Sequence, residues 1–408
     1  MKGKRSKMDL KGFLKVGHPG TLFGAFLYFD VSFMVWVLIG ALGVYISEDF
    51  SLTPTEKGFL VAVPILSGSL LRIPLGIAAD YFGPKKTGAV GLILTLIPLF
   101  AGWLGGKSPA EMFLVALMLG IAGASFAVAL PMASRWYPPQ YQGLAMGIAG
   151  AGNSGTVLAS LFAPRLAEYM GWHGVFGLAI LPVLLTLGIF LFVTMESPSQ
   201  PHPQTLEQYL CVLKEPDTWW FNLFYMVTFG GFVGLASFLA IFFHDQYGLS
   251  RVMSGNLTAL CVLAGSFLRP VGGLLADRFG GIKSLLILYW AVASLMFFVS
   301  QLPSLQAATL FLLLGMSALG MGNGAVFQLV PQRFQKEIGV VTGIVGAAGG
   351  LGGFFLPSLL GLCKDLTGSY GTGFLIFSLA AFSCIGLLAG VQRGWRRQWA
   401  RAETGVSF

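Results

Sequence analysis

Charged side chains are scarce in this chain of 408 residues: they make up 10% of it, whereas hydrophobic residues make up 55%. A soluble globular domain carries about 25% charged residues, so a soluble protein is excluded. The mean hydropathy of +0.76 and the 56 glycines are typical of membrane proteins, where small residues let helices approach closely. The sequence therefore predicts a polytopic membrane protein.

Cysteine and histidine are also few, with four of each. Neither a CxxC pair nor the spacing of a metal site occurs among Cys211, Cys261, Cys363 and Cys384. No nucleophile and base stand in a recognisable catalytic pattern. We expect isolated thiols packed among apolar side chains, histidines at wetted or interfacial positions, no metal, no cofactor and no enzymatic activity.

The net charge of +8 would suggest nucleic acid in a soluble protein, but here the basic residues lie mostly in short loops and tails. Of the 25 Lys and Arg residues, 18 fall on the side of the amino terminus, 5 on the other side and 2 within spans. Cytoplasmic loops carry such an excess of basic residues. We therefore expect the protein to lie in the inner membrane with both termini in the cytoplasm. We expect no nucleic-acid partner.

Long apolar runs are what the sequence has in abundance. A helix needs about 20 mostly apolar residues to cross a bilayer, and twelve such runs cover residues 20–47, 58–80, 86–105, 111–134, 143–169, 173–195, 218–243, 252–276, 283–302, 306–330, 338–362 and 372–392. A polar segment with four prolines, residues 196–217, interrupts them at the middle. We predict an all-α membrane protein with a six-helix bundle over 1–197, a cytoplasmic linker over 198–217, and a second bundle with a short basic tail over 218–408.

The two predicted bundles repeat one another. LRIPLGIAADYFGPKK, from Leu71, recurs 197 residues later within FLRPVGGLLADRFGGIKS, so that Arg72 matches Arg269 and Asp80 matches Asp277. GIAGASFAVALP at 120–131 resembles GMGNGAVFQLVP at 320–331, and GIAGAGNSG at 147–155 resembles GIVGAAGGL at 343–351. Parallel repeats of this kind place a site at mid-membrane between the halves.

The repeated arginines point to an anion. An ionised guanidinium at bilayer depth costs about 3 kcal/mol on insertion scales, and arginine cannot escape the cost by losing its proton. A protein carboxylate or an anionic ligand must compensate it. Arg72 and Arg269 stand eight residues before Asp80 and Asp277, which is about 12 Å of helical rise, too far for a direct pair in one helix. The sequence therefore predicts an anionic ligand held between the halves.

The Gly-x3-Asp-x2-Gly-x-Lys loop, formed by Gly76, Asp80, Gly83 and Lys85, resembles that of the major facilitator superfamily. The paired arginines, SFMVWVLIGALG at 32–43, GASFAVALPMASRWYPP at 123–139 and the two glycine-rich stretches resemble its nitrate/nitrite porter branch. The resemblance covers essentially the whole chain. It implies twelve helices and transport of nitrate, and of nitrite as well, by alternating access in a monomer.

The resemblance also implies further site residues. Asn153 would offer an amide and Tyr225 a hydroxyl to the anion, while Phe126, Phe229 and either Phe29 or Phe33 would cover its flat faces. The alternative for each phenylalanine is contact with lipid or a partner helix, because the chain has 35 of them. The alternative for Asn153 is a hydrogen bond between helices.

Two sets of residues are assigned to movement rather than binding. Small residues three or four apart give a smooth face for helix packing and sliding, which we expect of Gly147, Gly150, Gly152, Gly155, Gly343, Gly346, Gly349 and Gly350. A cytoplasmic latch, made and broken between states, is expected of Gly76, Asp80, Gly83, Lys85 and Asp277.

The coupling of transport rests on one unexpected carboxylate, Asp30, about ten residues into the first span. Its proposed role is to bind a proton and drive symport, and its alternative is a structural pair near the cytoplasmic mouth. Proton symport is the favoured mode and nitrate/nitrite exchange the second. Transport of another small anion, such as a monocarboxylate, and a non-transporting anion sensor stay open. A sensor would usually carry a signalling domain, and only about 16 residues follow the last span.

Overall fold

A computed structural model describes residues 13, 15–196, 206–334 and 338–403, and its regular elements there are all helices. Helices before residue 197 are α2 (Pro19–Trp36), α3 (Leu38–Ala41), α4 (Gly43–Asp49), α5 (Pro54–Phe82), α6 (Pro84–Leu104), α7 (Pro109–Gly123), α8 (Phe126–Ser134), α9 (Pro139–Gly150), the 3₁₀ turn η1 (Ala151–Ser154) and α10 (Gly155–Val193). Those after residue 205 are α11 (Leu206–Lys214), α12 (Pro216–Tyr247), α13 (Arg251–Phe279), α14 (Gly281–Ser300), α15 (Leu305–Arg333), α16 (Ile338–Thr367) and α17 (Gly371–Glu403). We call these two sets the first-half and second-half helices.

Ten helical stretches of the described chain are long and apolar enough to cross a membrane. One of them, Leu144–Val193, contains two crossings, because Gly171 takes a φ of 70° that reverses the direction of α10. A further crossing is made by α2, α3 and α4, which together run from Pro19 to Asp49. The described helices thus account for the twelve crossings predicted from the apolar runs.

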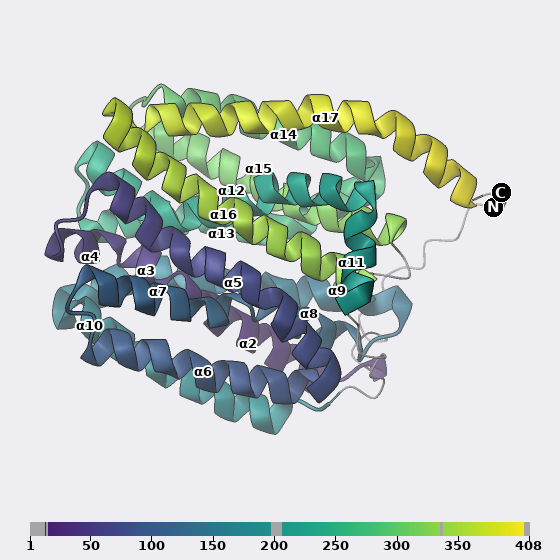
Figure 1. Cartoon of the computed structure of the whole chain (residues 1–408), viewed down its shortest axis with the longest axis horizontal. Helices are drawn as coiled ribbons and strands as arrows, with labels where there is room; N and C mark the ends of the chain where they lie inside the picture. The colour runs from purple at the N-terminus through teal and green to yellow at the C-terminus, as the bar shows by residue number, and fades with distance from the viewer. Residues whose placement is uncertain (1–12, 14, 197–205, 335–337, 404–408) are drawn as a thin grey trace.

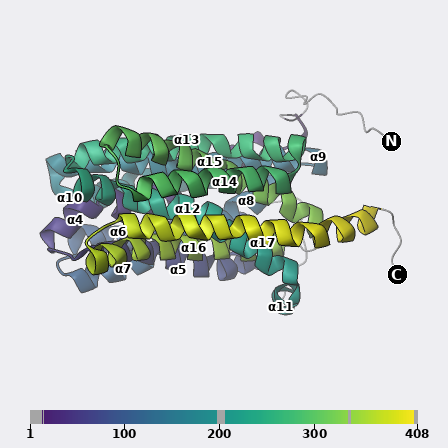
Figure 2. The ribbon, with the colours of Figure 1, turned by 90° about the horizontal axis from the view of Figure 1, so that it is seen from above.

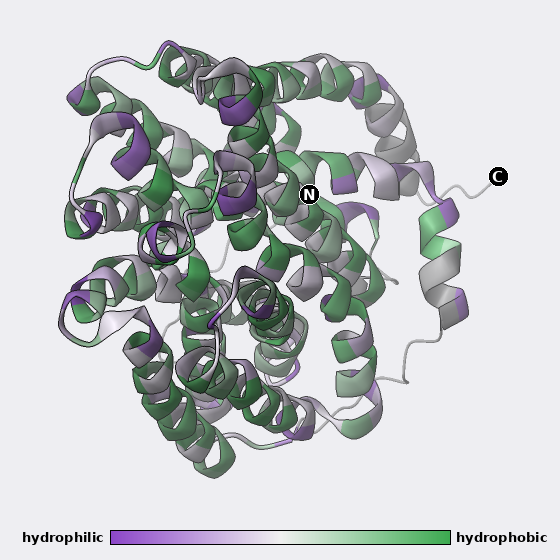
Figure 3. Cartoon of the chain, turned by 60° about the vertical axis from the view of Figure 1, so that its left-hand side comes forward, coloured by the Kyte–Doolittle hydropathy of each residue, from purple (hydrophilic) through white to green (hydrophobic). Residues whose placement is uncertain are grey.

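The helices lie alongside one another, with the first-half helices in the lower part of Figure 1 and most of the second-half helices above them. Figure 2 shows α9 and the last turns of α17 at the same end of the bundle; we call it the terminal end, and the other the opposite end. Figure 3 shows hydrophobic residues along most of the helix length and hydrophilic ones mainly at helix ends and connections. This distribution is that of a bundle surrounded by lipid.

Helix ends follow ordinary capping chemistry. Thr53 and Glu56 form a capping box at the start of α5, and the Ser108 side chain accepts from the third residue of α7. The repeated loops end α5 and α13 alike, because Gly83 and Gly280 take φ of 90° and 93°. The sequence repeat is thus also a repeat of backbone conformation.

Close helix crossings explain part of the glycine content. A Cβ at Gly272 would lie 1.9 Å from the carbonyl oxygen of Met321, and one at Gly320 would lie 1.9 Å from that of Gly265. Both contacts join α13 to α15. Only glycine permits backbones to approach this closely.

Three crossings are interrupted near their middle. Bends separate α2 from α3 at Val37 and α7 from α8 at Ala124 and Ser125, and the 3₁₀ turn η1 separates α9 from α10. Irregular backbone at membrane depth is tolerated where it is buried in protein or lines a cavity. These interruptions surround the candidate site.

The predicted linker and tail are more helical than expected. Within 198–217, α11 forms and α12 begins at Pro216, while residues 197–205 lie outside the described chain. The last helix, predicted to end at residue 392, continues to Glu403 because Arg, Gln, Ala and Glu favour helix. Cys211 is exposed on α11 rather than packed among apolar side chains, whereas Cys261, Cys363 and Cys384 are buried as expected.

Candidate anion-binding site

Arg72 of α5 is a fully buried charged side chain, with 1% of its surface exposed. Its Nε donates to the Gly123 carbonyl at 3.3 Å, at the bend between α7 and α8, and its Nη1 donates to the Gly346 carbonyl of α16. Its Nη2 is buried with no hydrogen-bond partner in the described chain. Arg72 therefore joins a first-half to a second-half helix and keeps one donor free.

Aromatic rings cover the faces of this guanidinium. The central carbon of Arg72 lies 5.5 Å from the ring centroid of Trp36, and 5.1 Å from those of Phe126 and Phe229. Cations are attracted to aromatic faces at such distances, more strongly where water is excluded. The rings hold the charge without neutralising it.

Arg269 of α13 is the matching group and is half-buried. Its Nη2 lies 3.5 Å from the Tyr225 hydroxyl, and its Nη1 is buried without a partner among the described residues. The ring of Phe327 lies 5.9 Å from its central carbon. Like Arg72, it presents one unused donor beside aromatic rings.

The aromatic rings around Arg72 and those around Arg269 contact one another. Tyr225 and Phe229 stack with centroids 5.0 Å apart, and Phe327 meets Tyr225 edge-on at 4.8 Å. Phe327 also lies 6.2 Å from Phe126, which covers Arg72. Tyr225 thus links the two cations, because its hydroxyl lies 3.5 Å from Arg269 and its ring stacks on Phe229, which covers Arg72. The result is a cluster of contacting aromatic rings around two cations, and we call this cluster the chamber.

Neither arginine forms an ion pair with a carboxylate in the described chain. Asp80 instead pairs with Arg135, and Asp277 accepts from the Gln328 amide at 3.0 Å. The alternative in which these aspartates compensate Arg72 and Arg269 is therefore not realised. The arrangement fits a small anion with several acceptor atoms.

The other predicted ligands lie on first-half helices and are buried. Asn153, in η1, is 1% exposed and its Oδ1 has no described partner. Phe29 and Phe33 contact rings that lie beside Arg72: the centroid of Phe29 lies 5.8 Å from that of Phe126, and that of Phe33 lies 4.8 Å from that of Trp36. These two rings support the rings that cover Arg72, and among the described residues neither ring lies over the guanidinium of Arg72 or Arg269.

Asp30 lies on α2 and is 8% exposed. Its Oδ1 accepts from the Ser154 hydroxyl at 2.6 Å, at the end of η1 where α10 begins. This carboxylate thus holds the first crossing to the fifth.

The glycines predicted to pack fall into two groups. A Cβ at Gly349 would lie 2.3 Å from the Tyr225 ring and one at Gly350 would lie 1.8 Å from Ser69 Oγ. Gly346 faces Phe126 and Arg72, and Gly343 is half-buried on the same helix. In the first half, Gly152 and Gly155 pack against Phe29 and Asp30 of α2, whereas no described atom lies within 4 Å of a Cβ at Gly147 or Gly150. These last two face open space.

At the terminal end, the predicted latch residues bond within their own half. Asp80 pairs with Arg135, and Lys85 Nζ donates to the carbonyls of Leu191 at 2.8 Å and Thr194 at 2.6 Å. Glu196 accepts from the backbone of Lys85 and Lys86, beside Gly83, while Gly76 is half-buried on α5. None of these bonds ties the first half to the second.

At the opposite end, ion pairs join the halves. Lys57 pairs with Asp245 at 2.7 Å, Glu48 pairs with Arg251, and a Glu48 carboxylate oxygen lies 3.1 Å from Nε2 of His244. Burial, and then the charge of Asp245, raise the pKa of the Tyr370 phenol, so it stays a neutral donor to that carboxylate at 3.0 Å. The bundle is closed at this end.

Replacement Glu48→Gln is expected to weaken this closure, because it removes the negative charge that pairs with Arg251. Exposed ion pairs contribute up to about 1 kcal/mol each, so a shift of about fivefold toward opening is expected. Spin labels at Tyr169 and Leu366, exposed residues of the two halves at this end, would report it as a longer distance. Glu111→Gln is the control, since Glu111 bonds Lys107 within one half; an equal shift in both variants would contradict the assignment.

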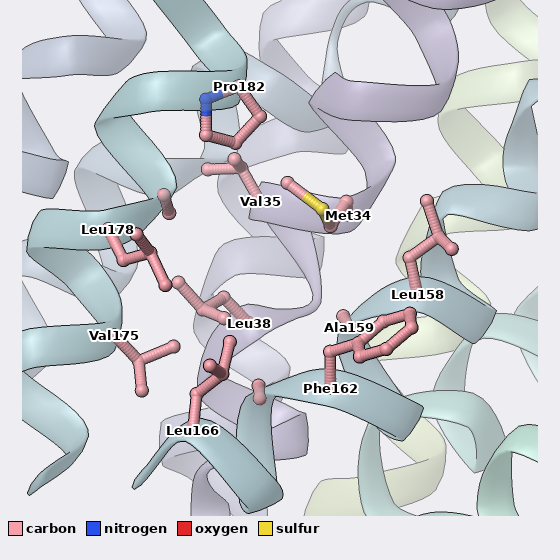
Figure 4. Close-up of a pocket in the computed structure, with 12 residues that line it drawn as sticks. Met34, Val35, Leu38, Leu158, Ala159, Phe162, Leu166, Val175, Leu178 and Pro182 are labelled. Atoms are coloured by element: carbon pink, nitrogen blue, oxygen red, sulfur yellow. The ribbon is translucent and has the colours of Figure 1, made fainter. Parts of the chain in front are cut away.

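A separate cavity of about 160 Å³ lies between α2, α3 and the two parts of α10. Figure 4 shows the side chains around it, among them Met34, Leu38 and Phe162, and none carries a charge or a hydroxyl. A small anion would lose its hydration there without gaining a partner. This cavity is therefore no part of the candidate site.

Sequence reasoning missed Phe327 and Trp36. Phe327 stands inside the repeated stretch at 320–331, next to the position that matches Phe126, which was a usable signal. Trp36 donates its indole N–H to the Pro64 carbonyl at 2.6 Å and so faces Arg72 with its ring. Only the three-dimensional arrangement shows that contact. Among the described residues, no group of His, Cys, Asp and Glu could hold a metal ion.

Comparison with known proteins gives consistent matches. The sequence family described as Major Facilitator Superfamily matches residues 24–357. A "Nitrite extrusion protein" of Bacillus subtilis (strain 168) is 35% identical over 354 residues, covering 86% of this chain and 89% of that protein. A "Probable nitrate/nitrite antiporter NarK1" of Thermus thermophilus is 33% identical over 393 residues, covering 88% of each.

Two further comparisons concern a transporter sequence and a solved structure. A "Probable nitrate transporter NarT" of Staphylococcus epidermidis (strain ATCC 35984) is 33% identical over 365 residues, covering 87% of this chain and 91% of that protein. The crystal structure of a bacterial homolog of the human lysosomal transporter Spinster superposes with a TM-score of 0.70 at 20% identity, over 91% of this chain and 96% of that one. The last likeness concerns the fold alone.

Proposed function

The chain belongs to the Major Facilitator Superfamily, and we propose that it carries nitrate and nitrite across the inner membrane as a monomer. It is a transporter rather than an enzyme. The names of relatives at 33% to 35% identity support these substrates. The observation that carries the proposal is the pair of unused donors, Nη2 of Arg72 and Nη1 of Arg269, inside the chamber.

The chemistry of nitrate matches this chamber. Nitrate is a planar monoanion with three acceptor oxygens, and a guanidinium offers planar, paired donors that suit it better than a point charge does. One arginine comes from each half, so an anion between them would neutralise part of their repulsion. The rings of Phe126 and Phe229 beside Arg72, and of Tyr225 and Phe327 beside Arg269, provide flat surfaces for it.

The same geometry supports alternating access by the two predicted bundles, 1–197 and 218–408. Ion pairs join the halves at the opposite end, whereas the bonds of the predicted latch at the terminal end stay within each half. With the termini in the cytoplasm, as the basic residues indicate, this state opens inward. In the outward-open state the bonds at the opposite end would break.

The sequence repeat suggests what replaces them. Arg72 donates across the halves to the Gly346 carbonyl, and in the repeat Arg72 matches Arg269 while Gly346 matches Gly150. Gly150 is buried, but no described atom lies within 4 Å of a Cβ placed there. Nη1 of Arg269 has no hydrogen-bond partner among the described residues. We propose that Arg269 donates to the Gly150 carbonyl in the outward-open state, so that each state has one arginine bonded across the halves.

Exchange of nitrate for nitrite is the coupling that this site favours. Without an anion, two positive charges face each other with no carboxylate paired to either in the described chain, which opposes closure. Any bound monoanion relieves the repulsion, so the carrier would close most readily when loaded. Proton symport through Asp30 is the second candidate, supported by the burial of this carboxylate at 8% exposure.

The test is nitrate flux in proteoliposomes that contain the purified protein. Exchange predicts uptake of labelled nitrate into vesicles preloaded with nitrite or nitrate and little uptake into empty vesicles. Symport predicts uptake into empty vesicles when the outside is acidic. Unlabelled formate and chlorate measure selectivity against other small anions. Binding of nitrate without flux under any of these conditions would instead support a sensor.

Asp30→Asn distinguishes the two modes. Because Asp30 bonds Ser154 and forms no ion pair with either arginine in the described chain, we expect exchange to stay within about twofold of wild type. If protons drive uptake through this carboxylate, uptake driven by a pH gradient would be lost in the variant while exchange continues. Gradient-driven uptake at the wild-type level in Asp30→Asn would end the proton-binding role. Thermal unfolding of both proteins controls for the lost bond to Ser154.

A further inference from the structure

Asn323 of α15 is a buried amide that the site described so far does not use. It is 1% exposed, and neither its Oδ1 nor its Nδ2 has a hydrogen-bond partner among the described residues. Burying a polar group without a partner is unfavourable. Exchanging the assigned positions of Oδ1 and Nδ2, which often restores a missing hydrogen bond, does not help here because neither position has a partner among the described residues.

The neighbours of Asn323 place it between the helices that carry Tyr225 and Arg269. A Cβ at Gly322 would lie 2.7 Å from the Thr228 side chain of α12, and one at Gly324 would lie 2.2 Å from the Arg269 carbonyl of α13. Residue 323 therefore stands at the junction of α12 and α13. Thr228 is one helical turn from Tyr225.

The next turn of α15 reaches the site directly. Phe327 follows Asn323 by four residues, so both lie on the same face of the helix. Phe327 contacts the Tyr225 ring at 4.8 Å and lies beside the Arg269 guanidinium. The same face of α15 thus presents first an amide and then a ring to the second-half side of the chamber.

The repeat shows that this amide is a departure from symmetry. Asn323 matches Gly123, whose carbonyl accepts from Arg72 and whose side-chain space is filled by the Trp36 ring, 2.2 Å from a Cβ placed there. The first half therefore has no room for a side chain at this position. The second half carries one, and it is polar.

We propose that Asn323 donates a third hydrogen bond to the bound anion, beside the two guanidinium donors, and thereby sets the preference between nitrate and nitrite. This inference rests on the proposed function. Nitrate has three oxygens and nitrite two, so two arginines satisfy nitrite more fully than nitrate. A site built to bond one more oxygen discriminates against the ligand that lacks it. Asn323 is thus the residue that favours nitrate.

The test measures exchange kinetics for nitrate and nitrite separately in wild type, Asn323→Ala and Asn323→Asp. Asn323→Ala is expected to raise the KM for nitrate about tenfold and that for nitrite at most about threefold, because only nitrate loses a partner. Asn323→Asp keeps the shape but places acceptors and negative charge beside the anion, so nitrate transport is expected to be lost. The decisive readout is the ratio of the KM for nitrate to the KM for nitrite, since a purely structural role would change both KM values alike.

Asn256→Ala is the matched control. Asn256 also has a buried, unpartnered amide oxygen, but it precedes Arg269 by thirteen residues of α13, about 20 Å along the helix. We expect no change of ratio there. An unchanged ratio in Asn323→Ala, or an equal change in Asn256→Ala, would overturn the proposal. If Asn323→Ala does not fold, Asn323→Ser is tested in its place, and the same loss of preference for nitrate over nitrite is expected. Absence of nitrate and nitrite transport in wild type would instead refute the proposed function.

Discussion

Replacement of Arg72 or Arg269 by lysine is expected to lower nitrate transport at least about 100-fold, as loss of a positioned donor to an anion commonly does. Lysine keeps the positive charge but lacks the planar, paired N–H donors of the guanidinium. At Arg72 the guanidinium bonds two carbonyls, those of Gly123 and Gly346, and still has Nη2 free. A lysine ammonium on a flexible stem cannot reproduce all three directions at once.

The measurement is exchange of labelled nitrate in proteoliposomes, with nitrate binding measured separately on the purified variants. Arg165→Lys is the control, because Arg165 is an arginine that donates to the Leu161 carbonyl of its own helix. It should stay within about twofold of wild type. Near-normal exchange in Arg72→Lys and Arg269→Lys would show that charge alone suffices and that bidentate recognition is wrong.

Bulky residues at two glycines are expected to abolish transport by trapping opposite states. In Gly58→Leu, a side chain would enter space where a Cβ already lies 2.4 Å from the Pro357 carbonyl of the other half. Backbone cannot yield as a side chain does, so the opposite end must open. In Gly150→Leu, the side chain fits this state, because no described atom lies within 4 Å, but it would block the approach of Arg269 to the Gly150 carbonyl.

Both variants should therefore lose exchange while keeping nitrate binding, which separates trapping from misfolding. Moving a two-state equilibrium almost completely takes about 5.5 kcal/mol, which a clash with backbone readily supplies. Spin labels at Tyr169 and Leu366 should lie farther apart in Gly58→Leu and at the distance of this structure in Gly150→Leu. Gly188→Leu is the control, since Gly188 also has no described neighbour within 4 Å. The same distance in Gly58→Leu as in wild type would contradict closure at this end.

The architecture was predictable because bilayer thickness constrains helix length so strongly. Apolar runs predicted twelve crossings, and the described helices account for them once α10 is divided at Gly171. The breaks at Val37 and at η1 were not predictable. Their residues are apolar or small, as in an intact span, and the irregular backbone is stabilised by tertiary contacts such as that of Ser154 with Asp30.

The site was predictable only in its charged part. An arginine in an apolar run stands out from composition alone, and the repeat doubled that signal at Arg72 and Arg269. Aromatic residues carry no such signal, because most of the 35 phenylalanines serve packing. Thus Phe327 was overlooked, and the ring contacts of Phe29 and Phe33 could not be foreseen. The partner of Asp80 was also beyond reach, since Arg135 is distant in sequence.

The two unneutralised guanidinium groups have an electrical consequence. With Arg72 and Arg269 unpaired by any described carboxylate, a vacant carrier moves about two positive charges through part of the membrane field, which is worth about 2.3 kcal/mol per charge for a full 100 mV drop. A carrier loaded with nitrate or nitrite moves one charge fewer in either direction, so swapping one monoanion for another is electroneutral. A membrane potential that is negative inside would therefore favour the inward-open state of the vacant carrier, in which an internal anion can bind.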